Sequence, residues 1–90
     1  MITRENLREV IDSLDGKTKR RILSSEKYYV VLTLHVFNVG AYATARLTND
    51  YGRYNQHAWK HGNCVLFIED VQSILKDLPI NVIMPEGSNH

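Results

Sequence analysis

The sequence predicts an α+β fold, in which an antiparallel sheet of three strands, or of four, carries two helices on one face. The expected order of elements is α-β-β-β-α(-β). Apolar residues recur at helical spacing near both ends of the chain, over residues 7–14 and 71–78. Two runs rich in β-branched and aromatic residues, 28–37 and 41–48, are separated by a short turn and not by a helix, so we expect them to pair as antiparallel strands.

The size and composition of the chain are typical of one globular domain. It has 90 residues, of which 43% are hydrophobic and 23% are charged. We expect a single compact domain over residues 1–84 and a flexible tail over 85–90. The single cysteine, Cys64, excludes an intrachain disulfide, and neither a secretory signal nor an apolar run of membrane length is present. We therefore expect a soluble, cytoplasmic protein without membrane contact.

The first helix is predicted from one apolar stripe, Leu7, Val10, Ile11 and Leu14. Thr3 is the expected N-cap, because its hydroxyl can accept a hydrogen bond from a free backbone N–H of the first turn. We expect Asp15 and Gly16 to end the helix, with the glycine in the left-handed conformation. The pattern over residues 17–24 is too short to decide for or against a second short helix.

The two strand-like runs predict a hairpin. The segment 38–41 has turn chemistry, and Gly40 is placed where a positive φ is needed. Pairing Phe37 with Tyr42 keeps apolar residues opposite apolar ones on one face and a mixed set on the other. We expect the apolar face to be covered by a helix.

The remaining elements follow a long polar and aromatic loop over residues 49–63. Residues 64–68 form a continuous apolar run, which predicts a strand buried on both faces. Asp70 is the expected N-cap of the last helix, and Pro79 is expected to end it. The sequence leaves open whether Ile80–Met84 is a fourth strand or an extended segment, and whether the 49–63 loop is ordered.

The charges divide the chain into two parts. The net charge of +1 combines an excess of basic residues over 1–64 with an excess of acidic residues over 65–90. All aromatic residues lie between Tyr28 and Phe67. A functional surface is therefore expected on the aromatic, mildly basic middle of the chain.

The leading hypothesis is a non-enzymatic binding module that acts through contact with a protein partner or through self-association as a homodimer. Its surface is the mixed face of the hairpin together with the 49–63 loop, because exposed aromatic and arginine side chains are typical of protein interfaces. The predicted binding residues are Tyr29, His35, Phe37, Tyr42, Arg46, Arg53, Tyr54, Trp59 and Lys60. The competing interpretation is that the loop folds over this face and buries it as a second core layer.

Nucleic-acid binding by the same surface is the alternative function. Aromatic rings stack on bases and basic side chains contact phosphate, and the basic run Lys17, Lys19, Arg20 and Arg21 would extend the surface. The order of elements is similar to that of double-stranded-RNA-binding domains. That family has lysines at the start of its second helix, where this sequence has Glu69 and Asp70, so no residue role is transferred from it.

Metal binding and catalysis have weaker support. His57, His61 and Cys64 are spaced closely enough to chelate zinc, with His35 as a further ligand from the neighbouring strand. The alternative is that the two histidines are polar loop residues and that Cys64 is a buried core residue. No nucleophile motif or phosphate loop occurs, so we expect neither an enzyme nor a cofactor.

Overall fold

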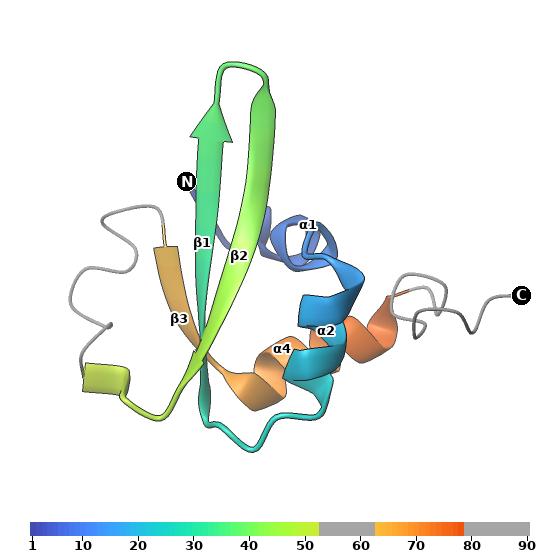
Figure 1. Cartoon of the computed structure of the whole chain (residues 1–90), viewed down its shortest axis with the longest axis vertical. Coiled ribbons are helices and arrows are strands. Elements are labelled where there is room, and N and C mark those ends of the chain that lie inside the picture. The colour runs from blue at the N-terminus through green and yellow to red at the C-terminus, as the bar shows by residue number, and fades with distance from the viewer. Residues whose placement is uncertain (53–62, 79–90) are drawn as a thin grey trace, which may run out of the picture.

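The computed structural model describes residues 1–52 and 63–78, and Figure 1 shows a twisted sheet with its helices gathered on one side. The elements are α1 (Leu7–Asp12), α2 (Gly16–Leu23), β1 (Tyr29–Phe37), β2 (Gly40–Thr48), β3 (Asn63–Phe67) and α4 (Ile68–Asp77). The strand order is β2-β1-β3, and both pairings are antiparallel. The α+β class and the three-stranded antiparallel sheet are thus confirmed. The possible strand over 80–84 and the tail over 85–90 lie outside the described residues.

The segment after the first apolar stripe forms the second helix that the sequence left open. Asp15 has extended backbone angles and accepts a hydrogen bond from the Thr18 N–H at 2.7 Å, so it is the N-cap of α2. Gly16 is the first residue of that helix. The prediction that Asp15 and Gly16 end the first helix with a left-handed glycine is therefore wrong, because the aspartate carboxylate instead begins a new helix.

The N-caps predicted for the first and the last helix are both displaced. Thr3 exchanges two hydrogen bonds with Asn6, of 2.6 Å and 3.2 Å, in a turn that precedes α1, and the helix begins at Leu7. α4 begins at Ile68, before the predicted cap Asp70, and follows β3 without a loop. The Ile68 N–H donates to the Tyr28 carbonyl at 2.8 Å, which ties the start of α4 to the start of β1.

The hairpin is tighter than predicted. Phe37 pairs with Gly40 across a two-residue turn, and Tyr42 pairs with His35. The predicted pairing of Phe37 with Tyr42 is wrong by two residues. Because side chains alternate with a period of two, this slip leaves every residue on its predicted face. Gly40 has φ +148°, as its predicted role in the turn requires.

The core lies between the helices and the even-numbered face of β1. Val30 and Leu32 are fully buried there in one cluster with residues of α1, α2 and α4, and Cys64 joins them from β3. The helices cover only part of the sheet: Val36, on the same face near the hairpin turn, is 66% exposed. Figure 1 shows the β1–β2 hairpin extending beyond the helical layer.

β3 does not have the complete burial that its apolar run predicted. It is an edge strand of five residues, with Cys64 buried, Val65 and Leu66 half-buried and Phe67 58% exposed. Helices cover one of its faces, and the described residues place no second layer on the other. No helix in the described part of the chain is long and apolar enough to cross a membrane.

Candidate functional site

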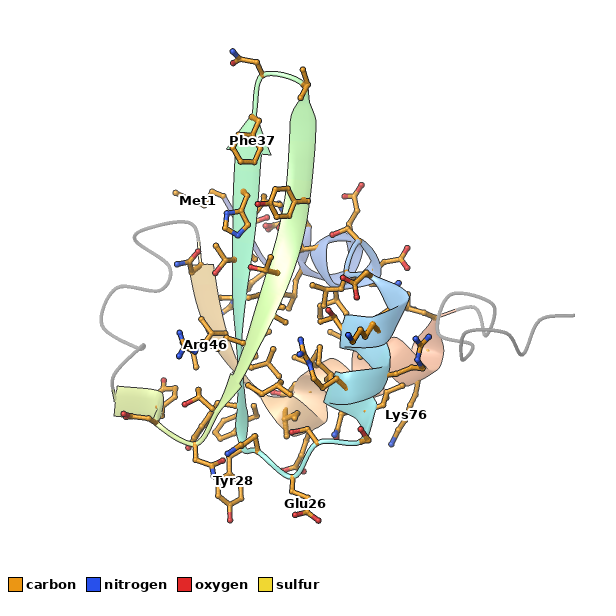
Figure 2. All side chains as sticks on the ribbon, viewed as in Figure 1. Met1, Glu26, Tyr28, Phe37, Arg46 and Lys76 are labelled. Atoms are coloured by element: carbon orange, nitrogen blue, oxygen red, sulfur yellow. The ribbon has the colours of Figure 1, made fainter. Side chains whose placement is uncertain are left out.

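The face of the sheet opposite the helices carries the predicted binding residues. Strand alternation and the two registers place one set of side chains there, which we call the open face. Its members are Tyr29, Val31, Thr33, His35, Phe37, Tyr42, Thr44, Arg46, Thr48, Asn63, Val65 and Phe67. The predicted residues Tyr29, His35, Phe37, Tyr42 and Arg46 all belong to it, and Figure 2 shows Phe37 near the hairpin turn and Arg46 further along β2.

Three rings form a stack at the hairpin end of the open face, which we call the tip cluster. The Tyr42 ring lies 4.7 Å from the His35 ring and 5.7 Å from the Phe37 ring, and both pairs are nearly parallel. His35 Nε2 is also 3.0 Å from Thr44 Oγ1. Direct and diagonal neighbours across an antiparallel pair produce such contacts. Phe37 and Tyr42 nevertheless remain 56% and 51% exposed.

A second group of rings lies at the other end of the open face. The Tyr29 ring is 5.0 Å from that of Tyr51 and 5.5 Å from that of Phe67. Tyr51 is placed by the segment after β2, where the Asn49 side chain accepts a hydrogen bond from the Tyr28 N–H at 2.9 Å. Half-exposed aromatic groups therefore occupy both ends of the face.

Phe67 was not among the residues predicted for this surface, and Tyr51 was predicted there as part of the 49–63 loop. Phe67 reaches it because β3 pairs with β1 and sets Phe67 opposite Tyr29. The continuous apolar run over residues 64–68 does not show which of its side chains face away from the helices, so Phe67 could be assigned only once the pairing of β3 with β1 was known. Arg53, Tyr54, Trp59 and Lys60 lie outside the described residues, as does most of the loop that the competing interpretation folds over the face.

The basic run lies apart from the open face. α2 packs through Ile22 against the helix-covered side of the sheet. Lys19 is only 2% exposed, and its Nζ lies 3.2 Å from Asp12 Oδ1. Lys19 therefore does not belong to an exposed basic patch, because its side chain is buried and pairs with Asp12. Lys17 and Arg21 are exposed, and Arg21 borders a shallow depression of about 270 Å³ beside β2 with Ala45, Arg46 and Leu47.

Cys64 is part of the core. It pairs with Leu32, and burial raises the pKa of its thiol to about 11. The thiol is therefore protonated at neutral pH, which is unsuited to nucleophilic attack. His35 cannot join Cys64 as a metal ligand, because the two side chains lie on opposite faces of the sheet.

His57 and His61 lie outside the described residues. Within residues 1–52 and 63–78, no three histidine, cysteine, aspartate or glutamate side chains gather in a way that could hold a metal ion.

These features define a small α+β domain whose antiparallel sheet has helices on one face and exposed aromatic groups on the other. Comparison of the chain with protein-family models, with curated proteins and with solved structures finds no match. The functional argument therefore rests on the geometry of the open face alone.

Proposed function

We propose that the protein is a small non-enzymatic binding module that contacts another protein through the open face and the projecting end of the hairpin. The observation that carries this proposal is the tip cluster, whose rings are held in a fixed stack while Phe37 and Tyr42 remain about half exposed. Ordered aromatic side chains lose little conformational freedom on binding, and they are frequent energetic anchors of protein interfaces.

The hairpin end is apolar on both of its sides. Val36 is 66% exposed on the helix side, and Val39 in the turn is 99% exposed. No Asp, Glu, Lys or Arg occurs between His35 and Arg46. A partner that presents an apolar surface would cover this end, and burying the exposed half of each ring would stabilise the complex by about 1 kcal/mol per ring.

The distribution of charge favours a protein partner over nucleic acid. Among the described residues of the open face, Arg46 is the one arginine or lysine. Lys17 and Arg20 belong to α2, on the other side of the sheet. Nucleic-acid affinity depends on several phosphate contacts made by one surface. The net charge of +1 adds little general attraction for phosphate.

The test compares the double variant Phe37→Ser/Tyr42→Ser with Tyr28→Ser. Tyr28 is an aromatic control, because it is 66% exposed and directly precedes β1, at the end away from the hairpin turn. Proteins captured from a cell extract by photo-cross-linking are identified, purified and titrated against each variant by calorimetry. We expect a purified partner to bind the wild type and Tyr28→Ser alike, and to bind the double variant about tenfold more weakly or worse.

The proposal is wrong if no purified protein binds in a way that depends on the tip cluster. Single-stranded oligonucleotides are titrated in parallel at low salt. Oligonucleotide binding that weakens steeply as salt is added and is lost in the double variant would replace the protein partner with nucleic acid.

A further inference from the structure

We propose that the outer edge of β2 pairs with β2 of a second copy of this chain, around a two-fold axis at Thr44, to form a continuous six-stranded antiparallel sheet. β2 is an edge strand: in the described sheet it is bonded to β1 on one side only. Figure 1 shows it running the full length of the hairpin beside β1.

In length and composition, this edge lacks the features that usually protect a sheet from pairing with another chain. β2 has nine residues, as many as the central strand, with no proline and a single charged residue, Arg46. Natural edge strands are commonly short, bulged or interrupted by proline or several charges. The other edge of the sheet, β3, has only five residues. β2 is therefore the long, regular edge on which a further strand can pair.

The hairpin geometry identifies the backbone groups that face outward. Phe37 and Gly40 flank a two-residue turn, so they form the hydrogen-bonded pair nearest to it. Antiparallel strands alternate between bonded and non-bonded pairs. The even-numbered residues of β2 therefore bond to β1. The outward N–H and C=O groups belong to Ala41, Ala43, Ala45 and Leu47.

The sequence of β2 is complementary to itself around Thr44. With the axis there, Ala43 lies opposite Ala45 of the second copy and Ala41 lies opposite Leu47 of the second copy, which makes both outward-facing pairs small or apolar. The one charged residue, Arg46, lies opposite Tyr42 of the second copy, where a guanidinium and an aromatic ring attract each other. This is the register in which all nine residues of β2 find a partner.

Charged residues of the helices also favour a second copy of this chain as the partner. Glu9 of α1 borders a depression of about 210 Å³ together with Ala41, and Arg21 of α2 borders the depression beside Leu47. Because Ala41 and Leu47 of opposite copies form a pair, the depression lined by Glu9 in one copy would adjoin the depression lined by Arg21 in the other. The two-fold axis repeats this pair of opposite charges, which is the reason to expect a second copy at this edge.

This inference does not depend on the function proposed for the open face. A two-fold axis perpendicular to the sheet places both open faces on the same side and leaves them uncovered. Failure of the edge pairing would leave the open face as it is, and failure of the open-face proposal would leave the edge pairing as it is.

The test measures the mass of the protein in solution by light scattering and sedimentation, over micromolar to millimolar concentrations, for the wild type, Thr44→Lys and Thr44→Glu. Thr44 is exposed, so both variants are expected to fold, and circular dichroism checks this. At the axis, two identical charges would face each other about 4.5 Å apart between Cα atoms and repel. We expect a dimer for the wild type, monomers for each variant alone, and a heterodimer when the two variants are mixed.

The matched control is Thr33→Lys. Thr33 pairs with Thr44 on the same face but lies one strand inward, on β1, so this variant should stay dimeric. A wild type that is monomeric at all concentrations overturns the proposal. So does a dimer that persists in both Thr44 variants, or one that Thr33→Lys also dissociates, because the contact would then be the open face. A second experiment tests the pair of opposite charges. Glu9→Arg and Arg21→Glu should each weaken the dimer, and combining them in one chain should restore it.

Discussion

The ion pair between buried Lys19 and half-exposed Asp12 shows how a residue can look functional in the sequence and be structural in the fold. Lys19 belongs to a run of basic residues, yet it is 2% exposed because α2 turns it toward α1. Burying an ammonium group without a partner costs several kcal/mol, so the contact with Asp12 at 3.2 Å is what makes this position tolerable. The pair therefore links the two helices.

Asp15, the N-cap of α2, should make the stability of the protein depend on pH. Its pKa lies below the usual 3.8 because its carboxylate accepts the Thr18 N–H at the start of α2. The folded state thus favours the charged form, and its contribution to stability is complete above pH 3.8 and is lost as the pH falls through the lower folded pKa. Asp15→Ala should lower the free energy of unfolding at neutral pH, as measured by urea denaturation.

Asp15→Asn separates capping from titration. An asparagine side chain also caps a helix but carries no charge, so this variant should keep most of the stability at neutral pH. The difference between the wild type and Asp15→Ala should shrink on acidification, whereas Asp15→Asn should change little relative to Asp15→Ala. A difference between the wild type and Asp15→Ala that stays constant through the acid range would contradict the capping role.

The hairpin is the element on which both proposals rest, and its turn depends on one backbone conformation. Asn38 and Val39 alone connect β1 to β2, and Gly40 follows with φ +148°, the one positive φ among the glycines that the structure describes. Residues with a side chain rarely adopt this conformation. The tightness of the turn sets the register, and the register places Tyr42 against both His35 and Phe37.

Gly40→Ala should therefore lower the free energy of unfolding by about 1–3 kcal/mol. The cost comes from the backbone and not from crowding, since a Cβ at this position would meet no atom within 4 Å. Gly52→Ala is the matched control, because Gly52 has no positive φ, and it should cause no loss. Denaturant unfolding of both variants gives the comparison, and equal stabilities would show that the turn tolerates a side chain.

Over the whole molecule, residues that hold the fold together and residues that face solvent lie in different parts of the same strand face. Leu32 and Val36 lie on one face of β1, but Leu32 is fully buried beneath the helices while Val36, near the hairpin turn, is 66% exposed. The helical layer is shorter than the hairpin, and this difference in length creates the projecting apolar end. The buried core residues of this face and its exposed apolar residue consequently lie toward opposite ends of β1.

Leu32→Ala should lower the free energy of unfolding by about 2–5 kcal/mol, since it removes core contacts and leaves a cavity. Val36→Thr keeps the β-branched shape and should change stability by no more than about 0.5 kcal/mol. Thermal and urea denaturation of the two variants measure the contrast. A large loss for Val36→Thr would mean that the hairpin end is packed against something in the folded protein.

Much of this fold could be predicted from the sequence, and the failures have physical reasons. Apolar residues repeat every two positions along a strand and every three to four along a helix, because of local backbone geometry. The α+β class, the two apolar stripes and the faces of β1 and β2 could therefore be predicted correctly. A slip of two residues in the hairpin register changes no face, so the hydrophobic pattern could not exclude it. Asp15 had the chemistry of a cap, but whether it ends one helix or begins the next depends on where the following turn packs.

The sequence by itself determined the class of the fold, the residues of the β1–β2 hairpin that share the open face and the aromatic character of that face. Only the tertiary structure decided that β3 pairs with β1 and brings Phe67 beside Tyr29, that Lys19 is buried, and that β2 is a long edge. Periodicity records which way each side chain points relative to its own backbone. Which segment lies beside which is settled by contacts between residues far apart in the chain.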